Sequence, residues 1–106
     1  KNYNISHTTT LTPGGSGAQL ASMAVLGSYL YVFSNLGATV ACNRFLASDL
    51  SGVTVITVSG TAWTSGQTAF SDGTDLYVYT TTNQFYRYTV SGTTITNAAT
   101  VTYTSA

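Results

Sequence analysis

The chain has 106 residues, enough for one domain, and only 6% of them are charged, against roughly 25% in ordinary soluble domains. Its three cations balance three carboxylates, so it lacks the basic stripe that a nucleic-acid-binding surface needs to displace counterions. A surface covered by Thr, Ser, Asn, Gly and Tyr scarcely titrates and favours an extracellular or virion-surface location, and no apolar run is long enough for membrane insertion.

The first 17 residues are expected to form a partial repeat followed by a loop. Residues 1–11 resemble the end of a later repeat, because Tyr3 aligns with Tyr88. Residues 12–17 (TPGGSG) contain the only proline, which predicts irregular backbone. His7 is the sole histidine and lies in a polar run, where a solvated strand residue is favoured over a catalytic base.

The first full unit spans residues 18–66. Residues 18–26 have the composition of a short helix, but their place in the repeat favours a strand. The last segment, residues 53–59, alternates Val and Ile with Thr, which predicts a half-exposed strand near a sheet edge. The unit is therefore expected to contain four strands, at residues 18–26, 29–34, 39–45 and 53–59.

The second unit, residues 67–106, repeats this order. Three pairs of segments match: Leu30-Tyr31-Val32-Phe33 with Leu76-Tyr77-Val78-Tyr79, Arg44-Phe45 with Arg87-Tyr88, and Ser51-Gly52 with Ser91-Gly92. The separations are 46, 43 and 40 residues (30 to 76, 44 to 87 and 51 to 91). The decrease indicates short loop insertions in the first unit, and the internal repeat identifies a repeat protein.

Four strands in about 40–46 residues are typical of a propeller blade. The run Leu76-Tyr77-Val78-Tyr79 is apolar at every position, as expected for a sheet that is packed on both faces. We therefore predict an all-β fold of two consecutive four-stranded propeller-like blades with an N-terminal partial repeat. The alternative is a β-sandwich.

The segments Ser-Asp-Gly-Thr-Asp-Leu-Tyr-Val (71–78) and Phe-Tyr-Arg-Tyr-Thr-Val-Ser-Gly (85–92) resemble the degenerate blades of β-propeller modules in phage tail and receptor-binding proteins and in bacterial surface proteins. The two-blade length is also similar to that of small propeller lectins that close a ring by trimerising. Those lectins typically present Arg, Glu and Trp in a sugar pocket, and this chain contains no Glu.

No catalytic site, cofactor or metal site is expected. The Asp72-Gly73-Thr74-Asp75 segment is explained by turn chemistry, with paired carboxylates for glycoside hydrolysis or a lone Ca²⁺ as the alternatives. Cys42 has no partner for an internal disulfide, and its apolar surroundings favour a buried structural thiol over a reactive one.

The aromatic residues carry the binding hypothesis. The strand tyrosines are expected mainly to pack between blades, while a Tyr- and Trp-rich surface can also bind a ligand. The predicted ligand-facing residues are Trp63 with Gln67, and Tyr86 with Arg87.

Two blades cannot close a ring, and each end would expose an apolar face and strand edges. We therefore expect homo-oligomerisation into a ring or a filament, unless the chain is an excerpt of a longer propeller. The expected function is that of a non-enzymatic structural or adhesive module, with a cell-surface glycan or receptor as a further partner. The alternative is a carbohydrate-binding lectin.

Overall fold

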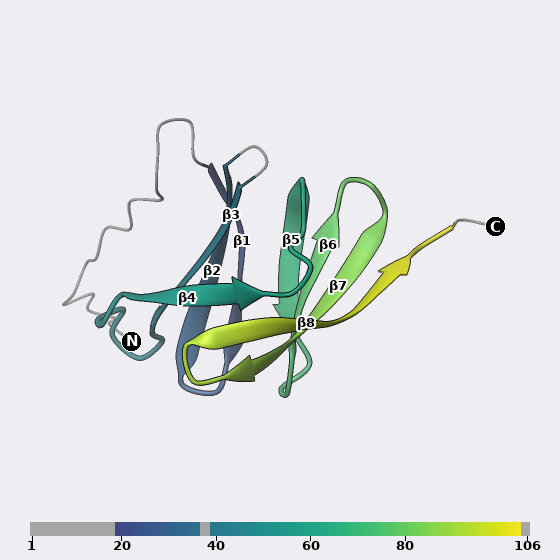
Figure 1. Ribbon diagram of the computed structural model, residues 1–106. Helices are drawn as coiled ribbons and strands as arrows, with labels where there is room; N and C mark the ends of the chain where they lie inside the picture. Colours follow the sequence, from purple (N-terminus) through teal and green to yellow (C-terminus); the bar gives the residue numbers. More distant parts are fainter. Residues whose placement is uncertain (1–18, 37–38, 105–106) are drawn as a thin grey trace, which may run out of the picture.

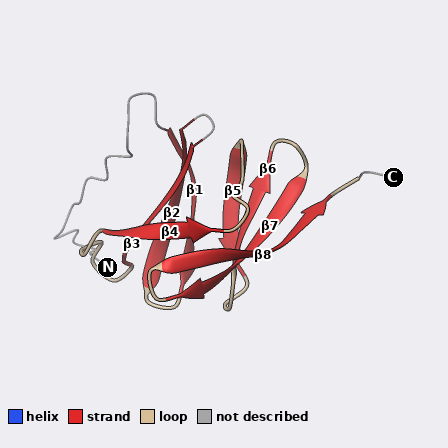
Figure 2. Ribbon diagram, viewed as in Figure 1, coloured by secondary structure: helices blue, strands red, loops and turns tan. Residues whose placement is uncertain are grey.

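A computed structural model describes residues 19–36 and 39–104 of the chain, and every regular element in these ranges is a β-strand (Figures 1 and 2). The prediction of an all-β protein is therefore confirmed. The strands are β1 Gln19–Leu26, β2 Tyr29–Leu36, β3 Thr39–Leu46, β4 Thr54–Ser59, β5 Gly66–Ser71, β6 Leu76–Thr80, β7 Gln84–Ser91 and β8 Thr94–Thr102.

The eight strands form one sheet in the order β1-β2-β3-β4-β8-β7-β6-β5. Each half is a meander, β1 to β4 (unit 1) or β5 to β8 (unit 2), and the halves are joined by a parallel pairing of residues 57–59 with residues 94–96. The two end strands, β1 and β5, lie side by side, so the sheet is nearly closed and barrel-like (Figure 1).

The prediction that residues 53–59 lie near a sheet edge is wrong. Strand β4 sits between β3 and β8, because its first residues pair with β3 and its last residues turn away to pair with β8. The half-exposed character holds: Ile56 is buried, while Val55 is 75% exposed. The N-terminal partial repeat, residues 1–17, lies outside the described residues.

The first three strands of each unit share one register. Met23 pairs with Val32 in unit 1, and Ala69 pairs with Val78 in unit 2. A register irregularity also occurs at equivalent places, between residues 20 and 22 and between residues 66 and 68. These equivalent positions are 46 residues apart, the separation of the first pair of matching segments, Leu30-Tyr31-Val32-Phe33 and Leu76-Tyr77-Val78-Tyr79.

The second hairpins also correspond, with Tyr31 opposite Arg44 in β2 and β3, and Tyr77 opposite Arg87 in β6 and β7. Successive side chains of a strand point to opposite faces of a sheet. We call the side of each unit that carries Tyr31 or Tyr77 its tyrosine face. The other side, which carries Leu30 or Leu76, is its leucine face.

The two units turn opposite faces toward each other. In unit 1, Tyr31 and Phe33 of the tyrosine face are 2% and 1% exposed. In unit 2 the leucine face is buried, with Leu76 and Val78 at 0% and 2% exposure, while Tyr77 on the other side is half-buried. The core is thus the contact between the tyrosine face of unit 1 and the leucine face of unit 2.

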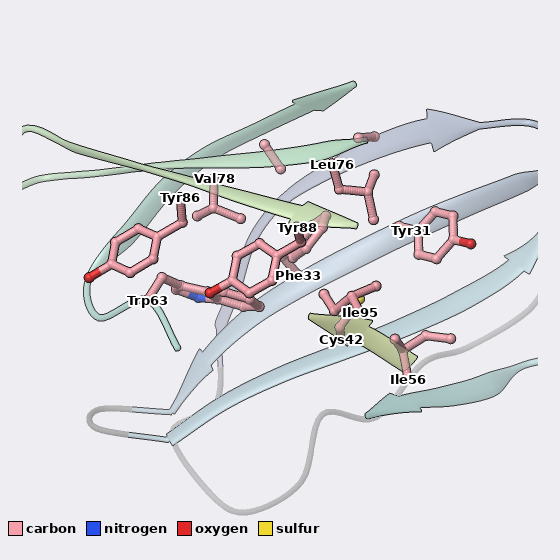
Figure 3. Packing of buried hydrophobic residues seen from close by; sticks show 12 residues of the cluster. Tyr31, Phe33, Cys42, Ile56, Trp63, Leu76, Val78, Tyr86, Tyr88 and Ile95 are labelled. Atoms are coloured by element: carbon pink, nitrogen blue, oxygen red, sulfur yellow. The ribbon is translucent and has the colours of Figure 1, made fainter. Parts of the chain in front are cut away.

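Trp63 fills one end of this core, between the units (Figure 3). Its ring makes edge contacts with Phe33 of unit 1 and Tyr88 of unit 2, at centroid distances of 5.3 and 5.5 Å. The Tyr88 hydroxyl donates to the Thr61 carbonyl at 2.8 Å. A side chain at Gly66 would place its Cβ 2.8 Å from Trp63 Cδ1, so the close packing of the indole requires glycine there.

Candidate functional site

The uncovered tyrosine face of unit 2 is the candidate functional site. Phe70 from β5 is 42% exposed and stacks on Tyr77 of β6, with ring centroids 5.0 Å apart and planes 2° from parallel. Tyr79 and Phe85 form a second aromatic pair, at 4.7 Å. Because cross-strand neighbours share a face, the pairing of Tyr77 with Arg87 adds a cation to this aromatic surface.

A polar cluster lies at one end of the face. Asp72 Oδ1 accepts hydrogen bonds from the backbone N–H groups of Thr74 and Asp75 at 2.9 and 2.8 Å. Its Oδ2 accepts from the Tyr77 hydroxyl at 2.9 Å. These bonds, above all the one from the Asp75 N–H, lower the pKa of Asp72, and the bond to Asp72 raises the pKa of Tyr77. The arrangement has the turn chemistry expected of an Asp-Gly segment.

Arg87 completes the cluster through an ion pair with Asp75, with Arg87 Nη1 3.2 Å from Asp75 Oδ2. The arginine side chain is 44% exposed, so water screens this pair and its contribution to stability is small. The guanidinium therefore remains available to another partner.

The matching arginine of unit 1, Arg44, makes different contacts. Its guanidinium carbon lies 3.9 Å from the centroid of the Tyr29 ring, and its Nη1 donates to the Gly92 carbonyl at 2.8 Å and to the Tyr31 hydroxyl at 3.5 Å. Gly92 lies in the turn between β7 and β8 of unit 2. Arg44 therefore ties the tyrosine face of its own unit to the neighbouring unit.

The leucine face of unit 1 is exposed only at its margins. Its central residues Val32 and Phe45 are buried, whereas Met23 and Val25 on β1 are 53% and 58% exposed, and Val55 on β4 is 75% exposed. A hollow of about 490 Å³ opens where β3 and β4 separate. It is lined by Val40, Ala41, Cys42, Asn43, Val55, Ile56 and Val58.

The structure places three of the four predicted ligand-facing residues, two in the core and one on an exposed face. Trp63 is 0% exposed and belongs to the core. Tyr86 is 6% exposed and points to the leucine face, opposite to its neighbour Arg87, because adjacent strand residues face opposite sides. Arg87 lies on the exposed tyrosine face, and the side chain of Gln67 lies outside the described part of the structure.

Sequence reasoning missed Phe70 and Phe85 as members of the exposed face. The signal for them was available, since Phe85 is two residues from Arg87 on the same strand and therefore shares its face. Phe70 is the cross-strand neighbour of Tyr77.

Cys42 is buried in the core at 1% exposure, as predicted. Burial raises the pKa of its thiol to about 12, with Arg44 acting in the opposite direction, so the group is protonated at neutral pH. His7 lies outside the described residues.

Within residues 19–36 and 39–104, no group of three or more His, Cys, Asp or Glu side chains gathers at a position where it could hold a metal ion. The same ranges contain no helix with the length and apolar character needed to cross a membrane.

No protein-family model, curated protein or solved structure matches the chain. The uncovered tyrosine face of unit 2 is therefore the feature from which a function can be inferred.

Proposed function

We propose that this chain is a non-enzymatic structural and adhesive module of an extracellular or virion-surface assembly, and that it self-associates through its blade faces and strand edges. One observation carries the proposal. The tyrosine face of unit 2 is exposed, although the equivalent face of unit 1 is buried against a neighbouring unit.

The two units are interpreted as consecutive propeller-like blades. Repeats that stack in one orientation bring one face of each repeat against the opposite face of the next. In a sandwich of two matching sheets, by contrast, the same face of each sheet would point into the core. The burial of Tyr31 in unit 1 and of Leu76 in unit 2 favours the blade interpretation. The short parallel pairing of β4 with β8 is an addition to the blade pattern.

A stack of this kind ends in two unlike faces, one tyrosine face and one leucine face. Terminal repeats need either a polar outer face or a neighbour. The outer face of unit 2 carries two aromatic pairs, Phe70 with Tyr77 and Tyr79 with Phe85. The outer face of unit 1 exposes Met23, Val25 and Val55 at its margins. Covering such apolar surface is the main driving force for association, which supports assembly with further copies.

A carbohydrate-binding lectin is the second candidate, favoured by one feature of the same face. Phe70 and Tyr77 stack beside Asp72, Asp75 and Arg87. An apolar ring surface next to a few polar groups is typical of small-ligand sites, and a cell-surface glycan is the ligand class that it suits.

Size-exclusion chromatography with light scattering, combined with a glycan array, tests the proposal. We expect oligomers at micromolar concentration and no selective glycan binding. A folded monomer at that concentration would contradict the self-association. Sharp binding to one sugar class, lost on substitution Phe70→Ala, would replace the structural module with the lectin.

A further inference from the structure

We infer that two copies of the chain pair through one and the same surface, the tyrosine face of unit 2, about a two-fold axis that runs along β6. In this contact Arg87 of each copy lies over Phe70 of the other, and Phe85 of each copy lies over Thr68 of the other. The inference rests on the proposed self-association and specifies which surfaces meet and in what orientation.

The tyrosine face of unit 2 is free for such a contact, whereas the other sheet faces are occupied. The tyrosine face of unit 1 and the leucine face of unit 2 cover each other in the core. The leucine face of unit 1 is closed at its centre, where Val32, Asn43 and Phe45 are buried within the single chain. Within the described ranges, no second uncovered face is left for the tyrosine face of unit 2 to meet. It therefore pairs with the same face of a second copy, and a contact between like surfaces closes at two copies instead of continuing into a ring or a filament.

The strand register gives this face a two-fold pattern around β6. Six side chains of β5, β6 and β7 form its centre, and none of them is buried: Thr68, Phe70, Tyr77, Tyr79, Phe85 and Arg87. Tyr77 has Phe70 opposite it on β5 and Arg87 opposite it on β7. Two sheets that pack face to face keep their strand directions within about 30° of each other. A two-fold axis along β6 therefore lays Tyr77 against Tyr77 of the second copy and places β5 of each copy over β7 of the other.

The charges on the face distinguish this axis from the one at right angles to it. An axis across the strands would bring the two Arg87 guanidinium groups together, and repulsion between like charges disfavours that arrangement. The axis along β6 brings each Arg87 over Phe70 of the other copy. Beside Phe70 lies the exposed carboxylate of Asp72, at the end of the same face. Each cation thus meets an aromatic ring and a negative charge.

Unit 1 contains a precedent for the contact between arginine and an aromatic ring. Arg44, the counterpart of Arg87, lies with its guanidinium carbon 3.9 Å from the centroid of the Tyr29 ring. A guanidinium is attracted to the face of an aromatic ring, and the attraction increases when water is excluded. The Arg87 side chain is 44% exposed, so it is accessible to a ring of a second copy.

The second row of the face is matched in size. Tyr79 has Thr68 opposite it on β5 and Phe85 opposite it on β7. The same axis places Phe85 of each copy over Thr68 of the other, so a large side chain meets a small one, as close packing requires. Strand β8 lies outside the overlap, because it is two strands from β6, whereas the sheet ends at β5, one strand from β6 on the other side. Tyr103, which directly follows β8, therefore stays exposed in the dimer.

An exchange of charges between two variants tests the pairing of like faces. Arg87→Glu brings a carboxylate toward Asp72 of the second copy, and Phe70→Arg brings a further cation toward Arg87. Each variant alone should be monomeric at micromolar concentrations where the unchanged chain is a dimer. An equimolar mixture should give a one-to-one heterodimer in light scattering and native mass spectrometry, because the introduced carboxylate and the introduced cation then face each other. Both positions are exposed, so each variant should keep the far-ultraviolet circular dichroism spectrum of the unchanged chain.

The possible failures are distinguishable. A mixture that stays monomeric while the unchanged chain dimerises would overturn the contact between like faces and leave self-association intact. Assemblies of the unchanged chain that are larger than a dimer would overturn the two-fold closure. A monomeric unchanged chain would overturn both this inference and the proposed self-association.

A matched pair of bulky substitutions tests the position of the axis without any change of charge. Thr68 and Val101 are both exposed, and Val101 shares the face through its pairing with Phe85. Thr68→Trp fills the space that Phe85 of the second copy occupies and should weaken dimerisation about tenfold or more. Val101→Trp adds the same indole outside the overlap and should leave the dissociation constant unchanged. Equal weakening by the two variants, or weakening by Val101→Trp alone, would contradict an axis along β6.

Discussion

Unit 1 and unit 2 share the register of their first three strands, yet the two units place opposite faces in the core. Tyr31 is 2% exposed, whereas its counterpart Tyr77 is half-buried and shares its face with exposed Phe70. The repeat therefore determines which side chains lie together on a face. Whether that face is interior or exterior depends on the neighbouring unit.

The two arginines show the same contrast in chemical terms. Arg44 lies over the Tyr29 ring and donates to a carbonyl of the other unit. Arg87 meets Asp75 at the position that corresponds to Tyr29. Arg44 has a neighbouring unit to bind, whereas Arg87 binds the Asp75 carboxylate of its own unit. This comparison predicts unequal effects for matched substitutions.

The largest difference is expected for the tyrosine pair. Tyr31→Ala should lower the free energy of unfolding by about 3 kcal/mol or more, because it leaves a cavity in the core. Tyr77→Ala should cost about 1 kcal/mol, mainly through the lost ring stacking. Urea unfolding followed by circular dichroism measures both. Equal costs would contradict the placement of these residues on opposite sides of the core boundary.

The arginine pair should differ next. Arg44→Ala removes a charged hydrogen bond between the units and should cost about 1.5–3 kcal/mol. Arg87→Ala breaks an exposed ion pair and should cost about 0–1 kcal/mol. The measurement is made on dilute, monomeric protein, so that association does not contribute. A larger effect at Arg87 than at Arg44 would reverse the comparison.

Cys42 provides a pH-dependent test in the core. Its pKa of about 12 in the folded chain lies above the ordinary value of 9.0, so the folded state holds the proton more tightly than the unfolded state. The stabilisation is fully present below pH 9 and is lost as pH rises toward 12, at no more than about 1.4 kcal/mol per pH unit.

Burial also raises the pKa of Tyr88. This contribution to the pH dependence is the same in the unchanged chain and in the Cys42→Ala variant. The advantage of the unchanged chain over Cys42→Ala in unfolding free energy should therefore shrink above pH 9. If the unfolding free energies of the two chains changed in parallel with pH, the Cys42 thiol would have the same pKa in the folded and unfolded states, which would contradict its burial.

The smallest effect concerns the polar cluster of unit 2. In the described part of unit 1 this cluster has no counterpart, since Leu26 occupies the position of Asp72. The pKa of Asp72 is lowered, so its contribution to stability is present above the ordinary pKa of 3.8 and is lost as pH falls through the lower folded value. Tyr77→Phe should raise this pKa only in part, because the backbone donors remain. Carbon-detected titration of the Asp72 carboxyl measures the change, and an unaltered pKa would argue against the Tyr77 hydrogen bond.

Much of the fold could be predicted from the sequence, because strands and turns depend on local patterns. The match of Leu76-Tyr77-Val78-Tyr79 with its earlier copy led to the correct strand positions in both units, and the expected buried thiol at Cys42 was confirmed. The pairing of β4 with β8 was not predicted, since it joins residues far apart in the chain and no local pattern specifies it.

The candidate site was predicted less well for a related reason. Trp63 looked like a ligand-facing residue, but it occupies the space that Gly66 leaves open between the units. Tyr86 and Arg87 are adjacent in sequence and therefore point to opposite faces of β7. The repeat could identify the members of each face. Only the packing of one unit on the other reveals which face remains uncovered.

Hydroxyl-radical footprinting read by mass spectrometry, carried out below and above the concentration of assembly, tests the central claim most directly. Tyr31 should be protected in both states, and Tyr103, which is 56% exposed, should be modified in both. We predict that Tyr77 is modified in the dilute chain and becomes protected on assembly, because the tyrosine face of unit 2 is then covered. Modification of Tyr77 at the same rate in both states, like that of Tyr103, would contradict the account.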